Sequence, residues 1–311
     1  MTKYKFAKEI EDFLNVLKDA GGFGIEDMEP IEARKLDLIE QERPEVKGVV
    51  EIGADGPFGP IPMYDYTPIG APENKALPAI IFYHGGGWVI GSRDGHDSLC
   101  RYLSNTTGCR VFSVGYRLAP EFKFPVPIDE SFTALKFISD NSEELNIDKS
   151  KIIVAGDSAG GNIAAVMSLM AREEKNLNVS YQLLIYPATD ASKERASYEE
   201  NAKGFLLERE GMRWFYKHYL ANDKDRKDWR VSPILAPDLS NLPPSYVITV
   251  AADPLRDEGR DYVEALRKAG NEVEHIEYDD VIHAFFSWPL AMNCAKNAAD
   301  AAGKAVKKAV G

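Results

Sequence analysis

The sequence has few cysteines and a shortage of positive charge. Three cysteines stand far apart among 311 residues, at positions 100, 109 and 294. Scattered cysteines in odd number do not build a disulfide framework, and the lack of any Cys-x-x-Cys pair or Cys/His cluster argues against a metal site. Lys and Arg number 37 against 49 Asp and Glu, so the formal net charge is −12. Such a field repels polyanions, and we expect neither nucleic acid nor an anionic membrane surface as a partner.

Long apolar runs are missing as well. No stretch approaches the roughly 20 apolar residues that cross a bilayer. Residues 1–22 have an amphipathic helical pattern with acidic side chains throughout, without the apolar core and small-residue cleavage site of a signal peptide. These absences predict a cytoplasmic protein that does not bind a membrane.

The pattern that is present changes along the chain. Residues 3–19 and 27–41 predict two helices, and β-like alternation follows at 49–52 and 61–64. From about residue 77, short buried strands alternate with longer helical stretches, which is typical of a parallel sheet covered on both faces. The predicted strands are Ala79–Tyr83, Arg110–Tyr116, Ile152–Ala155, Tyr181–Tyr186, Tyr246–Ala251 and Val273–Tyr278. The predicted helices of this part are Asp129–Asn141, Asn162–Ala171, Glu210–Leu220, Asp257–Ala269 and about 291–310.

One connection, residues 187–244, is too long for a simple crossover between two strands. It carries a helical pattern of its own, and insertions of this kind often form a lid. We therefore expect cap helices in residues 1–45 and a catalytic domain in residues 46–311. The cap would be completed by an insertion at about 188–230.

A Gly-x-Ser-x-Gly motif, Gly156-Asp157-Ser158-Ala159-Gly160, lies between a predicted buried strand and a predicted helix. Alone it is weak evidence, because roughly 0.1 matches are expected by chance at average composition. Its context is the strand, sharp turn and helix of a nucleophile elbow, in which Ser158 is the nucleophile. The other reading is a glycine-rich turn that binds phosphate.

A second motif, His84-Gly85-Gly86-Gly87-Trp88, follows another predicted strand. It is rare by chance, on the order of 0.002 occurrences in this length. Consecutive glycines after a strand let several backbone N–H groups point at one place. An acyl-transfer enzyme needs such donors for the oxyanion of its transition state, and the N–H of Ala159 would add another. His84 itself we interpret as a structural residue of the turn.

A serine nucleophile needs a base, and the chain has only five histidines: His84, His96, His218, His275 and His283. His283 directly follows the last predicted strand, and functional groups of an open α/β sheet gather at the carboxyl ends of its strands. His96 lies in a polar loop that could reach the same cleft, without an obvious orienting partner. We predict His283 as the base.

The base in turn needs a carboxylate to orient it. Asp253 follows the strand Tyr246–Ala251, and the order Ser158, Asp253, His283 is the order found in hydrolases with this elbow. Asp253 could also serve as an ordinary helix N-cap. Asp279 and Asp280 remain outside alternatives.

With these motifs the chain resembles the hormone-sensitive-lipase-like (family IV) esterases from about Pro78 to Trp288. The segments that carry the resemblance are His84–Trp88, Gly156–Gly161, Asp253–Glu258 and His283.

The resemblance implies the α/β-hydrolase fold, with a mostly parallel sheet, helices on both faces and a helical cap. It implies a carboxylesterase that cleaves short- to medium-chain esters without cofactor or metal. Ser158, Asp253 and His283 would form the triad, and Gly86, Gly87 and Ala159 the oxyanion hole. Members of the family often form homodimers.

Two alternatives remain open. The chain could be a catalytically silent ligand-binding protein on the same fold, or an amidase or acyltransferase that uses the same triad. Phe205, Trp214 and Phe215 in the insertion either line an acyl pocket or fill the core of the cap.

Overall fold

The fold centres on one mostly parallel sheet, seen in a computed structural model that describes residues 3–22, 24–36, 39, 41–73 and 75–311. Within these ranges the strand order is β1-β2-β4-β3-β5-β6-β7-β8. The first two pairings, β1 with β2 and β2 with β4, are antiparallel, and all later ones are parallel. The strands are β1 (Gly48–Ala54), β2 (Ile61–Thr67), β3 (Leu77–Tyr83), β4 (Arg110–Val114), β5 (Ile147–Asp157), β6 (Tyr181–Ile185), β7 (Ser245–Ala252) and β8 (Val273–Ile282).

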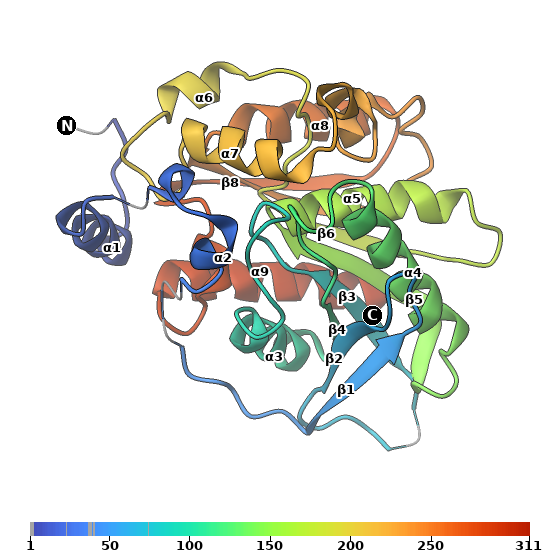
Figure 1. The fold of residues 1–311 in the computed structure, drawn as a ribbon. Helices are drawn as coiled ribbons and strands as arrows, with labels where there is room; N and C mark the ends of the chain where they lie inside the picture. Colours follow the sequence, from blue (N-terminus) through green and yellow to red (C-terminus); the bar gives the residue numbers. More distant parts are fainter. Residues whose placement is uncertain (1–2, 23, 37–38, 40, 74) are drawn as a thin grey trace.

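Helices cover both faces of this sheet (Figure 1). The α-helices are α1 (Lys8–Asp19), α2 (Pro30–Ala33), α3 (Asp97–Thr107), α4 (Val126–Asp140), α5 (Ala159–Arg172), α6 (Ala196–Glu200), α7 (Arg209–Tyr219), α8 (Arg256–Lys268) and α9 (Asn293–Val310). The 3₁₀ helices are η1 (Ile25–Asp27), η2 (Asp223–Lys227), η3 (Pro233–Leu235) and η4 (Phe285–Ser287).

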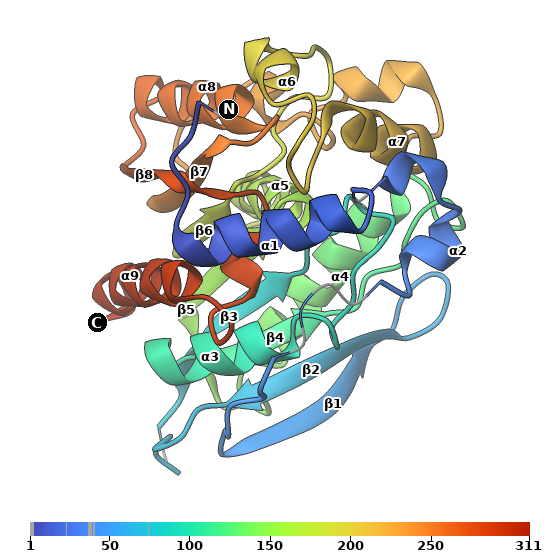
Figure 2. The same ribbon diagram turned by 90° about the vertical axis from the view of Figure 1, so that its left-hand side faces the viewer.

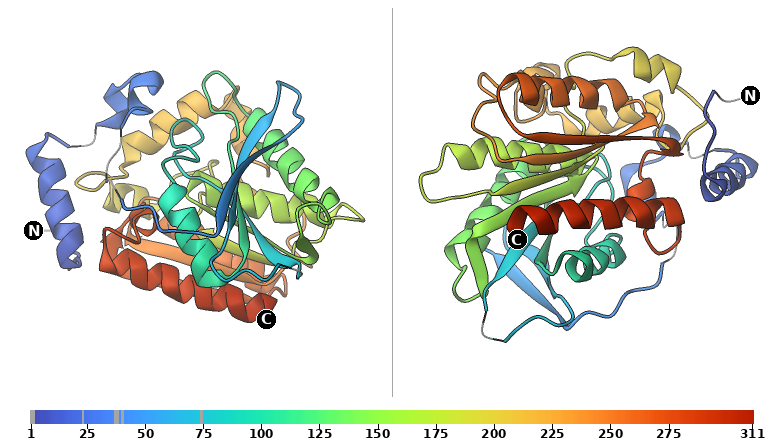
Figure 3. Two further views of the ribbon diagram at one scale, coloured as in Figure 1. Left: turned by 90° about the horizontal axis from the view of Figure 1, so that it is seen from below. Right: turned by 180° about the vertical axis from the view of Figure 1, so that it is seen from behind.

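Buried strand residues alternate between two apolar clusters, one on each face of the sheet. In β3, Ile81 belongs to the cluster that includes residues of α4, α5 and α8, whereas Ile80 and Phe82 belong to the cluster with α3 and α9. This is the two-residue period of a strand whose two faces are both covered. Figure 3 shows α9 and α3 side by side on the second face.

The N-terminal segment and the long insertion lie together at one end of the sheet (Figure 2). Trp214 of α7 donates its indole N–H to the carbonyl of Met28, at 3.2 Å. The insertion residue Phe205 packs edge-on against Tyr4 and Phe6. Segments nearly two hundred residues apart in the chain therefore share one layer above the sheet.

Most of the predicted elements are present with shifted ends, and one prediction is wrong. Residues 27–41 do not form one helix: α2 ends at Ala33, and residues 37, 38 and 40 lie outside the described residues. Ile31 is 58% exposed and Leu36 41% exposed, so this apolar pattern has little to pack against and cannot stabilise a longer helix. The helix α3, conversely, was not predicted.

In the described part of the chain, no helix is both long enough and apolar enough to cross a membrane.

Candidate active site

The residues singled out in the sequence come together at the carboxyl edge of the parallel strands. His84 follows β3, Ser158 follows β5, Asp253 follows β7 and His283 follows β8. Four separate loops thus contribute to one place, as expected where parallel strands end.

Ser158, His283 and Asp253 form a continuous hydrogen-bonded chain. Ser158 Oγ lies 2.9 Å from His283 Nε2, and His283 Nδ1 lies 2.6 Å from Asp253 Oδ2. The second carboxylate oxygen of Asp253 accepts the N–H of Leu255 at 2.8 Å. Asp253 is fully buried and His283 is 6% exposed. With its proton on Nδ1, the imidazole presents a basic Nε2 to the serine hydroxyl.

The backbone at Ser158 is strained, as a nucleophile elbow requires. Its φ is +56°, in the region that non-glycine residues rarely occupy. Two glycines make this turn sterically feasible. A Cβ on Gly160 would lie 1.8 Å from the carbonyl oxygen of Tyr83, and one on Gly156 would lie 2.3 Å from that of Gly160.

The residues that follow β3 form a second strained turn, here called the glycine loop (residues 84–91). Gly86 has φ +110°, Gly87 has φ +58° and Trp88 has φ +61°. The amides of Val89 and Ile90 return to the carbonyl of Gly86, at 3.0 and 2.9 Å. The loop therefore curls back on itself beside Ser158.

The backbone N–H groups of Gly86, Gly87 and Ala159, near Ser158, are among those that lack an acceptor in the described part of the chain. Ala159 is the first residue of α5, where N–H groups point out of the helix and the helix dipole favours negative charge. Such a set of donors suits an anionic oxygen.

Helix α7 forms a wall against the glycine loop. A Cβ on Gly87 would lie 2.1 Å from Cδ1 of Phe215. The buried ring of Trp88 stacks on Tyr219, with centroids 4.3 Å apart and an interplanar angle of 5°. Because α7 belongs to the long insertion, the insertion shapes the glycine loop directly.

A cavity of about 470 Å³ opens onto Ser158 and His283. Its apolar wall comes from the insertion and from the C-terminal loop. Of the three aromatic residues left open by the sequence, Phe215 lines the cavity, Phe205 packs against the N-terminal segment, and Trp214 packs against Phe215 and His218. The other apolar lining side chains include Leu206, Leu207, Met212 and Trp288.

His84 is buried beneath the glycine loop. Its ring stacks on Tyr116 with centroids 4.4 Å apart, and Nδ1 lies 2.8 Å from the carbonyl of Gly85. Burial and the nearby His96 lower the pKa of His84 to about 4, so its ring is neutral at physiological pH. These contacts agree with the structural role expected for it.

His96 has a partner that the sequence did not reveal. Its Nε2 lies 3.2 Å from Asp157 Oδ1, within ion-pair distance although outside hydrogen-bond geometry. Burial acts to lower the pKa of His96, but the Asp157 carboxylate outweighs burial and raises it above its usual value. Asp157 is itself buried and accepts the N–H of Gly85 at 2.9 Å. We expected no orienting partner for His96. This expectation is wrong, because Asp157 lies beside its ring.

The two remaining histidines lie elsewhere. His218 packs on Trp214 in α7, and His275 lies in β8 beside Thr249. Neither lines the cavity. In the described ranges, no group of three or more His, Cys, Asp or Glu side chains could hold a metal ion.

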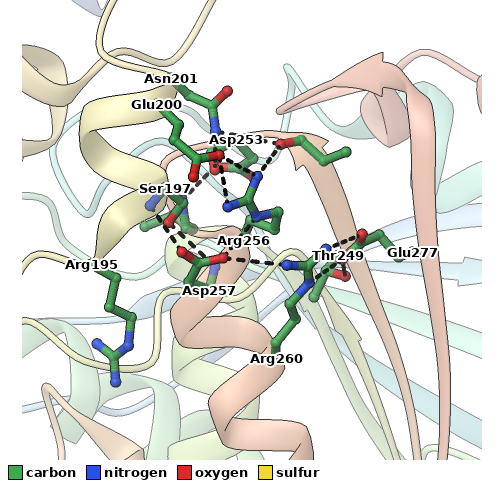
Figure 4. A network of polar contacts seen from close by, with 12 residues as sticks. Arg195, Ser197, Glu200, Asn201, Thr249, Asp253, Arg256, Asp257, Arg260 and Glu277 are labelled. Atoms are coloured by element: carbon green, nitrogen blue, oxygen red, sulfur yellow. Dashed lines mark hydrogen bonds and ion pairs between the residues drawn. The ribbon is translucent and has the colours of Figure 1, made fainter. Parts of the chain in front are cut away.

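A polar network ties the loop that carries Asp253 to the insertion (Figure 4). Asn201 donates to the carbonyls of Asp253 and Ala251, at 3.1 and 3.4 Å. Ser197 Oγ donates to the carbonyl of Pro254 at 2.6 Å. Arg256 forms an ion pair with Glu200 at 3.1 Å. The sequence offered no signal for this network beyond the polar character of these residues.

Comparison with known proteins agrees with this geometry. A sequence model of the alpha/beta hydrolase fold matches residues 80–287. Carboxylesterase NlhH of Mycobacterium tuberculosis is 40% identical over 263 residues, 83% of this chain and 81% of NlhH. Carboxylic ester hydrolase LipN of the same organism is 38% identical over 245 residues; the aligned part spans 77% of this chain but only 64% of LipN.

The fold matches solved structures along nearly its whole length. Ester-hydrolase EH1AB1 from the metagenome of Lake Arreo superposes with a TM-score of 0.93 at 40% identity, covering 97% of this chain and 98% of that one. The chain therefore belongs to the α/β-hydrolase family, in its hormone-sensitive-lipase-like (family IV) branch.

Proposed function

We propose that this protein is a serine carboxylesterase that hydrolyses short- to medium-chain carboxylic esters through an acyl-enzyme. The observation that carries the proposal is the unbroken hydrogen-bonded chain from Ser158 through His283 to Asp253, beside three unpaired backbone N–H groups. Its relatives NlhH and LipN, a carboxylesterase and a carboxylic ester hydrolase, support the same reaction class.

In the first half-reaction, His283 takes the proton of Ser158 as Oγ attacks the ester carbonyl. Asp253 holds the Nδ1–H of His283 and stabilises the imidazolium that forms. The N–H groups of Gly86, Gly87 and Ala159 bind the oxyanion. A single donor of this kind is typically worth about 10²–10³ in rate.

His283 then donates its proton to the departing alcohol, which leaves an acyl-enzyme on Ser158. In the second half-reaction, His283 deprotonates a water molecule that attacks the acyl carbon. The same three N–H groups stabilise the second oxyanion, and the acid departs as Ser158 regains its proton.

We also propose that residues 1–45 and the insertion at about 188–230 together form the cap over residues 46–311. Asn162 of α5 donates to the carbonyls of Ala188 and Val231, at 2.8 and 2.9 Å. Both ends of the insertion are thus tied to the helix that follows Ser158. Ala33 from the N-terminal segment and Phe215 from the insertion line the same cavity, which supports a shared cap.

The substrate range follows from the size and lining of the cavity. A cavity of about 470 Å³ lined by both apolar and polar side chains fits a small ester, since small-molecule pockets run from about 300 to 1,000 Å³. In a series of p-nitrophenyl esters from acetate to palmitate, kcat/KM should be highest for short to medium acyl chains. A maximum at palmitate would contradict this range.

Three experiments test the reaction itself. Ser158→Ala should fold normally and retain less than roughly 1% of the turnover of p-nitrophenyl butyrate, because loss of a triad serine costs at least about 10³ in rate. A fluorophosphonate probe should label Ser158 stoichiometrically, whereas a silent ligand-binding protein would remain unlabelled. A panel of esters, anilides and alcohol acceptors distinguishes an esterase from an amidase or acyltransferase.

A further inference from the structure

The guanidinium of Arg34 joins three segments that are distant in sequence. Its Nε donates to the carbonyl of Val89 at 2.8 Å, and one terminal nitrogen donates to the carbonyl of Ala119 at 2.7 Å. The two terminal nitrogens also pair with the two carboxylate oxygens of Glu121, at 2.8 and 2.6 Å. Arg34 directly follows α2 in the N-terminal segment, and its side chain is 22% exposed.

Both carbonyls belong to the frame of the glycine loop. Val89 lies inside the loop, and its own amide returns to the carbonyl of Gly86 at 3.0 Å. The amide of Ala119 donates to the carbonyl of Trp88 at 2.9 Å. Arg34 therefore bridges two parts of the frame around the turn that carries the N–H groups of Gly86 and Gly87, and it also lines the cavity.

This turn needs support from outside. Gly86, Gly87 and Trp88 all have positive φ, and Trp88 has a side chain that makes φ +61° unfavourable. The two glycines adopt positive φ readily, but at Trp88 it is a strained conformation that persists only where the surroundings hold it. Phe215 and Tyr219 press against the loop, and Arg34 holds two carbonyls of its frame.

We propose that Arg34 is a positioning residue for catalysis: it fixes the direction of the glycine-loop N–H groups and so tunes the stabilisation of the oxyanion. The proposal rests on the proposed esterase function. It assigns the N-terminal segment a part in the chemical step, in addition to covering the cavity. Arg34 does not touch the reacting atoms, and it acts through Val89 and Ala119.

The geometry requires arginine. A guanidinium presents its N–H donors in a rigid planar fork, and here the fork serves two carbonyls and a carboxylate at once. A lysine ammonium is a single flexible point of charge, and it cannot hold both carbonyls and both oxygens of Glu121 in one arrangement. The substitution Arg34→Lys therefore keeps the charge and removes the bridge.

The kinetic signature distinguishes positioning from cap docking. Misplaced oxyanion donors weaken the transition state more than the bound substrate, so kcat should fall while KM stays nearly constant. If Arg34 only anchored the cap, the substrate site would loosen, and KM would rise with kcat unchanged.

The test compares parent, Arg34→Lys and Arg34→Gln on p-nitrophenyl butyrate. For both variants we expect a kcat at least about tenfold below that of the parent, with KM within about twofold, since an ångström of misplacement can cost about 10² in rate. The second-order rate of inactivation by diethyl p-nitrophenyl phosphate should fall by a similar factor, because phosphorylation of Ser158 uses the same donors.

Arg172→Lys is the matched control. Arg172 likewise donates to two backbone carbonyls, those of Asp238 and Ser240, and pairs with Glu173, but it stands at the far end of α5, about 20 Å along the helix from Ser158. Its variant should keep the kcat of the parent. Thermal unfolding of all variants shows whether each is folded. If Arg34→Lys does not fold, the kcat and KM of Arg34→Gln test the proposal.

Four outcomes overturn the inference. Parental kcat in the folded Arg34 variants would overturn it, and so would a rise in KM alone. An equal loss of kcat in Arg172→Lys would show a general effect of loosened packing. Failure of the parent itself to react with either the ester or the organophosphate would refute the esterase function and, with it, the inference. Loss of kcat confined to the Arg34 variants supports it.

Discussion

The carboxylate of Asp157 accepts a hydrogen bond from the N–H of Gly85 at 2.9 Å, although 72 positions separate the two residues in sequence. The residue before the proposed nucleophile thus holds the start of the glycine loop. The bond is buried, and a buried N–H without an acceptor costs about 1–3 kcal/mol. The side chain of Asp157 therefore fixes the position of the glycine loop relative to the turn that carries Ser158.

Replacing Asp157 should lower activity by an amount that depends on whether the new side chain can still accept the N–H of Gly85. In Asp157→Ala the N–H of Gly85 loses its acceptor, and we expect kcat for p-nitrophenyl butyrate to fall by about 10- to 100-fold. In Asp157→Asn an amide oxygen can still accept that N–H, so kcat should fall less. Steady-state kinetics of both variants check this order, and an Ala variant as active as the parent would contradict it.

Gly87→Ala should disable the oxyanion donors through a steric clash. The new methyl would lie 2.1 Å from Phe215, at a φ of +58° that alanine disfavours. We expect a loss of about 10² in kcat, comparable to removal of one donor. The double variant Gly87→Ala/Phe215→Ala should recover part of that loss, because it removes the obstructing ring. Absence of any recovery would show that the strained backbone alone limits the reaction.

Removal of His96 should have an effect on stability that depends on pH. Burial acts to raise the pKa of Asp157, but His96, His84 and the Gly85 N–H outweigh burial and keep the pKa below 3.8. Burial acts to lower the pKa of His96, but the Asp157 carboxylate in turn raises it above its usual 6.5.

The stability that Asp157 contributes is present above pH 3.8 and is lost as pH falls through its lowered pKa. The stability that His96 contributes is present below pH 6.5 and is lost as pH rises through its raised pKa. The parent should therefore exceed His96→Gln by about 2 kcal/mol between about pH 4 and 6.5, with a narrowing difference at alkaline pH. Urea unfolding across this range measures the difference. His218→Gln is the control. The pKa of His218 is lowered, so its replacement should not give a loss of stability that is largest between about pH 4 and 6.5.

Asn201 should couple the insertion to the carboxylate of the triad. Its amide is buried and donates to the carbonyls of Ala251 and Asp253, and Tyr4 Oη lies 2.8 Å from its Oδ1. Asn201→Ala should cost about 1–3 kcal/mol in the free energy of unfolding and lower kcat/KM, since the loop bearing Asp253 loses these bonds. Asn178→Ala removes an exposed amide bond to Ser150 and should be near neutral in both measurements. Equal effects of the two substitutions would be inconsistent with the coupling.

The sheet and the gathering of Ser158, Asp253 and His283 could be predicted because they follow from local rules. Buried runs mark the strands, and functional groups collect where parallel strands end. The ion pair of His96 with Asp157 and the bridge made by Arg34 could not be predicted, because each joins loops that only the folded chain brings together. The homodimer and the cytoplasmic location stay predictions, since neither follows from the fold of one chain.

The helix predicted over residues 27–41, which does not form as one helix, shows what hydrophobic periodicity alone cannot predict. Its apolar residues repeat at helical spacing, yet Ile31 and Leu36 remain largely exposed, and the side chain of Arg34 reaches across to other loops instead. A pattern predicts a helix only if the fold provides a surface that buries its apolar face.

The contact between Phe215 and Gly87 limits how this enzyme can acquire new substrates. Enlarging the cavity at Phe215 would admit bulkier esters, but the same ring contacts the loop whose N–H groups we propose as the oxyanion donors. A gain in substrate range at this position would therefore come with a slower reaction. Leu206 and Leu207 also line the cavity, whereas the atoms nearest to a Cβ at Gly87 belong to Phe215, so an evolving or engineered variant should broaden its specificity at the two leucines at less expense to turnover.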